Sequence, residues 1–119
     1  MMRTILTTTV MALAAATPAH ATAGMDCTTG GKAPIDVSLV ISRVIGGPLI
    51  SAGLSDNGTE VPNSVAQWWL DRTELRLLLI DPNAEREEVE IRARARGDRY
   101  VGTLRRAGRS RPVRCEDSG

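Results

Sequence analysis

The side chains able to carry out catalysis are few in this chain of 119 residues. The single histidine is His20, close to the N-terminus, and the only cysteines are Cys27 and Cys115. Beyond residue 20 there is therefore no histidine to act as a general base or a metal ligand, which excludes histidine triads and the common zinc sites. The glycines at 46–47 precede a proline and an apolar stretch, which is not a phosphate-binding loop. We expect no cofactor and no metal.

Paired carboxylates are the remaining route to hydrolysis. The candidates all lie at predicted turns or strand ends, where acidic residues are common for local reasons: Asp56, Glu60, Asp71, Glu74 and Asp81. A domain of 98 residues, from 22 to 119, also leaves little room for a substrate cleft. The sequence therefore predicts that the protein is not an enzyme.

A tryptophan pair is the first feature that indicates binding. Trp68 and Trp69 are adjacent, and neighbouring residues on a strand point to opposite faces. Ala66 and Leu70 share the face of Trp68, so we expect Trp68 in the core and Trp69 exposed. An exposed tryptophan is a plausible contact for a sugar ring or a protein partner. The alternative is that a loop or an arginine covers Trp69.

An arginine-rich stretch is the second feature. Residues 22–119 carry 14 basic and 14 acidic side chains, but between Arg92 and Arg114 there are nine arginines and one acid. Arg92, Arg94 and Arg96 alternate along one predicted strand, and Tyr100 follows them. Such a face could bind an anionic ligand, a glycan or an envelope protein. The alternative is a solvated face, with arginines paired to glutamates on neighbouring strands.

The elements that position these residues are predicted to be strands. Residues 87–96 alternate strictly, with Val89, Ile91, Ala93 and Ala95 on one face and Glu88, Glu90 and the arginines on the other. Good helix formers make a helix over 84–96 the main alternative, but the period of two favours a strand. Turn residues delimit further expected strands at 35–42, 49–54, 59–61, 64–71, 75–80, 100–105 and 111–115. The prediction is an all-β meander of seven or eight short strands, forming a small antiparallel barrel or sandwich.

The two ends of the chain indicate export and a covalent closure. Residues 1–21 combine a positive charge, a short apolar run, Pro18 and the small-x-small site Ala19-His20-Ala21, which predicts a signal peptide cleaved after Ala21. Residues 22–119 are then expected to form a single exported domain, periplasmic or secreted. An oxidising destination and two cysteines predict one disulfide, Cys27–Cys115, which closes the sheet. We expect no membrane span and a monomer.

One short segment resembles a known family. Gly97-Asp98-Arg99-Tyr100 is similar to the second half of the Ser-Gly-x-x-Tyr motif of small periplasmic inhibitors of c-type lysozyme, which are disulfide-bearing β-barrels. The serine is missing, because Ala95-Arg96 precedes the glycine, and the basic surroundings would repel a basic lysozyme. The resemblance covers four residues and implies, at most, an inhibitor that acts through a protein interface.

Together these features predict a non-catalytic binding module that uses Trp69, Arg92, Arg94, Arg96 and Tyr100 to bind an anionic or glycan-type ligand. The alternative is a proteinaceous inhibitor or envelope-assembly partner that acts through a protein–protein interface. An exported protein with a single aromatic residue among its arginines is a poor candidate for nucleic-acid binding.

Overall fold

A computed structural model describes residues 22–42 and 47–118 and shows an all-β protein. Its strands are β1 (Thr22–Thr28), β2 (Ile35–Ser42), β3 (Leu49–Asp56), β4 (Thr59–Val61), β5 (Ser64–Leu70), β6 (Glu74–Ile80), β7 (Glu87–Arg96), β8 (Arg99–Arg106) and β9 (Arg109–Asp117). The all-β prediction is confirmed, with nine strands in the described residues in place of seven or eight. The additional strand is β1. The predicted signal peptide, residues 1–21, lies outside the described residues.

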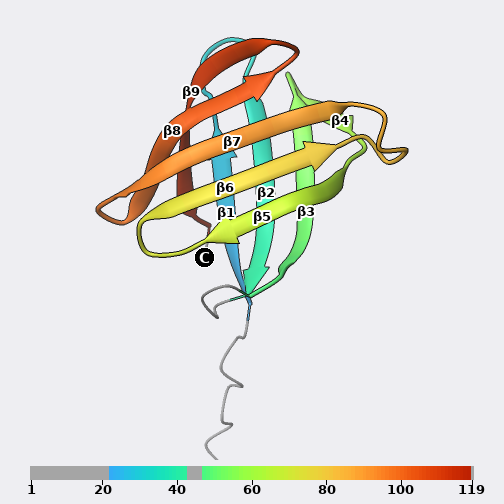
Figure 1. The fold of residues 1–119 in the computed structure, drawn as a ribbon. Coiled ribbons are helices and arrows are strands. Elements are labelled where there is room, and N and C mark those ends of the chain that lie inside the picture. The colour runs from blue at the N-terminus through green and yellow to red at the C-terminus, as the bar shows by residue number, and fades with distance from the viewer. Residues whose placement is uncertain (1–21, 43–46, 119) are drawn as a thin grey trace, which may run out of the picture.

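All nine strands form one curled antiparallel sheet, a half-barrel (Figure 1). The strand order is β4-β3-β2-β1-β9-β8-β7-β6-β5, so β1 pairs with β9 and the sheet has its two edges at β4 and β5. Strands β5 to β8 cross in front of β1, β2 and β3 in Figure 1, and the core lies between these two halves. No helix among the described residues is long and apolar enough to cross a membrane.

The alternating pattern of the sequence places the core. Val89, Ile91 and Ala93 of β7 are buried, and they lie opposite Leu79, Leu77 and Leu75 of β6, which are buried as well. The intervening residues of β6 are less buried: Arg76 is exposed and Leu78 is only partly covered. The prediction of a buried strand over 75–80 therefore holds for one face of β6, and the other face reaches solvent.

A disulfide joins the first and last strands, as predicted. Cys27 of β1 and Cys115 of β9 are direct cross-strand partners, and both side chains are fully buried in the core. The bond closes a segment with a sequence separation of 88 residues. It fixes the pairing between the two halves of the meander at the centre of the sheet.

The connections between strands lie at two ends of the half-barrel. The β1–β2, β3–β4, β6–β7 and β8–β9 connections gather at one end, which we call the Arg106 end after the last residue of β8. The β5–β6 and β7–β8 connections lie at the other end. The β3–β4 turn contains Asn57 and Gly58 with φ of 49° and 83°, which confirms the hairpin turn expected from the Asn-Gly pair.

Candidate binding surfaces

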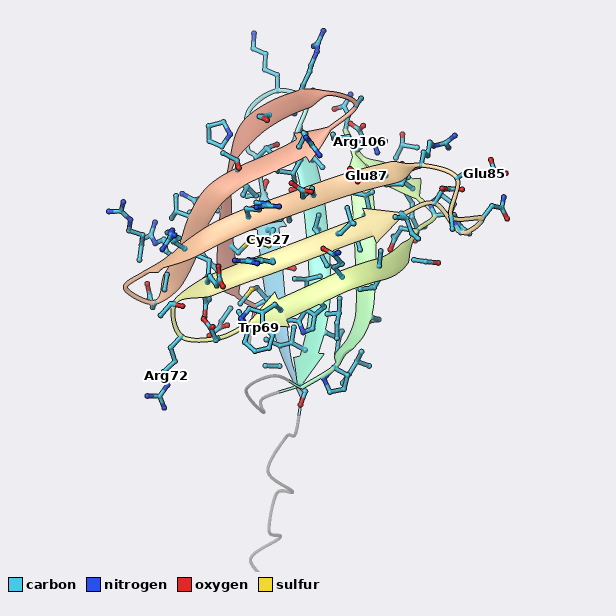
Figure 2. All side chains as sticks on the ribbon, in the orientation of Figure 1. Cys27, Trp69, Arg72, Glu85, Glu87 and Arg106 are labelled. Atoms are coloured by element: carbon cyan, nitrogen blue, oxygen red, sulfur yellow. A yellow bond between two sulfur atoms is a disulfide. The ribbon has the colours of Figure 1, made fainter. Side chains whose placement is uncertain are left out.

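The two tryptophans lie where the sequence predicts. Trp68 packs against the core and its Nε1 donates a hydrogen bond to the Gly47 carbonyl over 3.2 Å. Trp69 is 42% exposed on the edge strand β5 (Figure 2). Its Nε1 donates to Asp71 Oδ2 over 2.9 Å, which restrains the indole ring beside the β5–β6 turn. Trp69 therefore offers a large, restrained apolar side chain to solvent.

The sheet register aligns Trp69 with arginines. Trp69 lies opposite Arg76 of β6, and Arg76 lies opposite Arg92 of β7. With neighbouring strands about 4.8 Å apart, the row spans about 10 Å. Arg94 follows two residues after Arg92 on the same face of β7 and lies opposite Glu74. We call the surface formed by Trp69, Arg76, Arg92 and Arg94 the Trp69 face.

The ion pairs on the Trp69 face are exposed and local. Arg76 Nε lies 3.1 Å from Glu74 Oε2, and Arg92 Nε lies 3.2 Å from Glu90 Oε1. The arginine side chains remain 59% and 70% exposed, so each pair contributes little to stability. Arg94 forms no ion pair with any described residue. The guanidinium groups are therefore available to a partner at low cost, and the solvated-face alternative describes only part of this surface.

Arg76 was absent from the predicted site, and its place follows from the register alone. In the sequence it is one polar residue in the apolar run 75–80, with no mark that distinguishes it from any exposed strand residue. The predicted Arg96 lies further away, opposite Arg99 beside the β7–β8 turn. Four residues separate it from Arg92 along β7, or about 13 Å. Arg96 is thus on the same outer face but distant from Trp69.

The position of Tyr100 differs from what the predicted site requires. It lies opposite Ala95 and Cys115, packs against the core, and its hydroxyl donates to the Asp71 carbonyl over 2.6 Å. Burial is the main cause that raises the pKa of Tyr100. Its ring is therefore on the inner face, opposite to the arginines, and its hydroxyl is already occupied. Tyr100 holds the β5–β6 turn in place and does not belong to the Trp69 face.

Asp71 organises that turn. Its Oδ1 accepts hydrogen bonds from the Thr73 amide, the Thr73 hydroxyl and the Glu74 amide, at 2.7, 2.8 and 2.8 Å. These bonds, with the one from Trp69 Nε1, hold the pKa of Asp71 far below its usual range. A carboxylate kept ionised in this way cannot serve as a general acid, and its role is to position Trp69.

A second cluster of charged side chains surrounds Arg106, which Figure 2 labels. Arg106 Nε donates to Asp56 Oδ2 and its NH1 to Glu88 Oε2, both over 2.8 Å, and Arg86 Nε donates to Glu88 Oε1 over 2.8 Å. The Glu88 side chain is only 6% exposed. The prediction that Glu88 faces solvent is therefore wrong, because the pairing of β6 with β7 shifts register between Leu79 and Ile80 and the bulge turns Glu88 inward.

Glu88 makes a pH-dependent contribution that a variant should reveal. Hydrogen bonds from Arg106 and Arg86 lower the pKa of Glu88 from 4.5. Below about pH 4.5, Glu88 is therefore protonated in the unfolded chain but still ionised in the folded protein. The free energy of unfolding decreases as pH falls through this range. We expect Glu88→Gln to lower the free energy of unfolding at pH 7 by about 2 kcal/mol, since charge-assisted hydrogen bonds are lost.

Urea titrations of both proteins at pH 7 and pH 3 provide the measurement. The difference in the free energy of unfolding between wild type and Glu88→Gln should be smaller at pH 3, because the stabilisation by ionised Glu88 is lost as pH falls. Glu60→Gln is the matched control: Glu60 is exposed on β4 and forms no ion pair with a described residue. A gap for Glu88→Gln that is constant across this range would show that the variant acts through packing and not through charge.

Comparisons with known proteins do not assign the chain to a family: no family, no curated protein and no solved structure matches it. The resemblance to lysozyme inhibitors thus gains no support, and Tyr100, its most characteristic residue, has its hydroxyl bound to Asp71. Among residues 22–42 and 47–118, no group of three or more acidic, cysteine or histidine side chains could hold a metal ion.

Proposed function

We propose that this protein is a non-catalytic, exported binding module that binds an acidic protein surface through the Trp69 face. The observation that carries the proposal is the cross-strand row in which Trp69, Arg76 and Arg92 lie in register, with Arg94 beside them. Tryptophan and arginine are the residues most enriched at the energetic centres of protein interfaces. The guanidinium groups supply bidentate donors for carboxylates.

The exposure of the Trp69 face favours a protein partner over a small ligand, because Trp69, Arg76 and Arg92 are all exposed. Residues of the Trp69 face line neither the hollow at the Arg106 end nor the one beside the β7–β8 turn. A small ligand gains most of its affinity from enclosure, whereas a protein interface of standard size needs only a complementary open surface. An inhibitor or envelope-assembly partner would use such a surface.

Two features support export. The order of charge, apolar run and small residues in 1–21 is typical of a secretory signal peptide. The Cys27–Cys115 bond joins two buried cysteines, and such bonds form and persist in oxidising compartments such as the periplasm. A non-catalytic role agrees with the carboxylates of the described residues: hydrogen bonds lower the pKa of Asp71 and of Glu88, the opposite of what a general acid requires.

The test is affinity capture with matched variants. We expect immobilised oxidised protein to retain an acidic protein from periplasmic extract at low salt, and the triple variant Arg76→Ala, Arg92→Ala, Arg94→Ala to retain at least tenfold less. Losing several charge-assisted contacts at about 1.5 kcal/mol each is sufficient for that change. Trp69→Ala should weaken retention with no change in its dependence on salt, because it removes apolar contact and no charge.

The control is a second triple variant of equal charge, Arg96→Ala, Arg99→Ala, Arg114→Ala, which leaves the Trp69 face intact. It should retain the partner as wild type does. If both triple variants retain equally less partner, the interaction depends on net charge alone, which would contradict the proposal. If the retained material is a polysaccharide, the ligand of the Trp69 face is an anionic glycan and the proposal of an acidic protein partner is wrong.

A further inference from the structure

The Arg106 end contains a hollow of about 1070 Å³, which none of the residues of the Trp69 face lines. Three connections of the half-barrel, β1–β2, β6–β7 and β8–β9, and the end of β3 contribute to its wall. The lining includes Ile35, Asp56, Arg86, Glu88, Arg106 and Arg109. The mouths of β-barrels are common positions for small-molecule sites, and this volume lies just above the usual range for such sites. Its walls combine small apolar residues, Ala33 and Ala107 among them, with four arginines.

The base of this hollow is fixed in advance. The Arg106 side chain is only 19% exposed, and its Nε and NH1 groups are held by Asp56 and Glu88 from two other strands. Its NH2 group donates to no described residue. Arg86 likewise uses only Nε, towards Glu88, and remains 74% exposed. Both guanidinium groups therefore keep donors available while their positions are set by the Glu88 carboxylate.

Arg109 has no part in that network. It lines the hollow, is exposed, and forms no hydrogen bond or ion pair with any described residue. Arg111, on the same wall, is bound to the carbonyls of Ala33 and Gly30 and neutralises no carboxylate. The lining carries four arginines and three carboxylates, Asp56, Glu87 and Glu88, a surplus of one positive charge. Glu87 also lies 3.4 Å from Arg105, outside the lining, which reduces its effect further.

We propose that this hollow binds a small organic anion, in which a carboxylate or phosphate is held by Arg86, Arg106 and Arg109 and an apolar group rests on the exposed Ala33 and Ala107. Planar guanidinium groups with free donors match the geometry of both oxyanions. The competing interpretation is that Arg86, Glu88 and Arg106 only close the end of the core. That interpretation gives no role to Arg109, and the two therefore differ in what they predict for this residue.

Calorimetric titration of the purified oxidised protein tests the proposal. The probes are octyl phosphate, octanoate and inorganic phosphate, at constant ionic strength and below the micelle concentration. We expect saturable binding of octyl phosphate or octanoate, and at least tenfold weaker binding to Arg109→Ala with an unchanged urea midpoint. Preference for one amphiphile identifies phosphate or carboxylate as the recognised group. Weaker binding of inorganic phosphate supports a contribution from the apolar wall.

Two controls separate this site from the Trp69 face. Arg114→Ala removes an arginine of the outer face and should bind as wild type does. The triple variant Arg76→Ala, Arg92→Ala, Arg94→Ala should also bind the probes as wild type does. The two proposed sites are therefore tested independently of each other. The proposal is overturned if no probe binds saturably, or if Arg109→Ala and Arg114→Ala weaken binding equally.

Discussion

Reduction of the Cys27–Cys115 disulfide is expected to lower the free energy of unfolding by roughly 4–5 kcal/mol, as the loop-entropy relation gives for a closed segment of this length. The bond joins β1 to β9, and through this pair the β2–β4 and β5–β8 parts of the meander are held in one sheet. For a domain of this size the loss is a large share of the total stability, which is about 5–15 kcal/mol.

Urea unfolding of the oxidised and the reduced wild-type protein, followed by the fluorescence of Trp68 and Trp69, measures this effect without any substitution. A Cys27→Ala, Cys115→Ala double variant then separates the lost crosslink from the presence of free thiols. We expect the reduced protein and the double variant to share a strongly lowered midpoint. Midpoints within about 0.3 M of the oxidised protein would show that pairing of β1 with β9 alone fixes the ends, since 0.3 M corresponds to less than 1 kcal/mol at usual urea slopes.

Most of the fold could be predicted from the sequence because its physical basis is local. The alternation in 87–96, the Asn57-Gly58 turn and the two cysteines each specify a strand, a hairpin or a closure from a few adjacent residues. Strand β1 was missed although Ala23, Met25 and Cys27 alternate with Gly24 and Asp26. Its residues have weak strand propensity, and the strand is stable because β2 and β9 flank it.

The candidate site depended on information that no local pattern contains. Arg76 joins Trp69 through cross-strand register, and Glu88 turns inward at a bulge whose position the alternation does not reveal. The sequence groups Tyr100 with the arginines as a ligand-binding residue, because β8 has no clear apolar alternation that would assign Tyr100 to the inner face. The inner residues of β8 include Gly102 and Arg106, whereas the apolar Val101 points outward. The alternation within single strands thus predicts which side chains are exposed. Only the long-range pairing of strands determines which of these side chains lie next to one another.

Gly102 is where that pairing is most sensitive to substitution. It lies in the middle of β8, opposite Ala93 of β7 and Val113 of β9. A Cβ atom at this position would overlap the Arg92 carbonyl oxygen and come within 2.6 Å of the Ala93 Cα. Both are backbone atoms, which cannot rotate away as a side chain can. The absence of a side chain at residue 102 therefore permits the close approach of β7 to β8 where the sheet curls.

We expect Gly102→Ala to lower the free energy of unfolding by more than about 3 kcal/mol, the upper end of the cost of overpacking, because β7 and β8 must separate to accept one methyl group. Gly53→Ala is the matched control: Gly53 is also within a strand, but its added Cβ would lie 3.9 Å from the nearest atom, Ser38 Cβ, an ordinary contact. It should be neutral or slightly stabilising in the same urea titration. Because the displaced carbonyl belongs to Arg92, a folded Gly102→Ala protein should also bind the acidic partner less tightly than Gly53→Ala. Equal stability of the two variants would mean that the sheet does not need the close contact of β7 and β8 at this point.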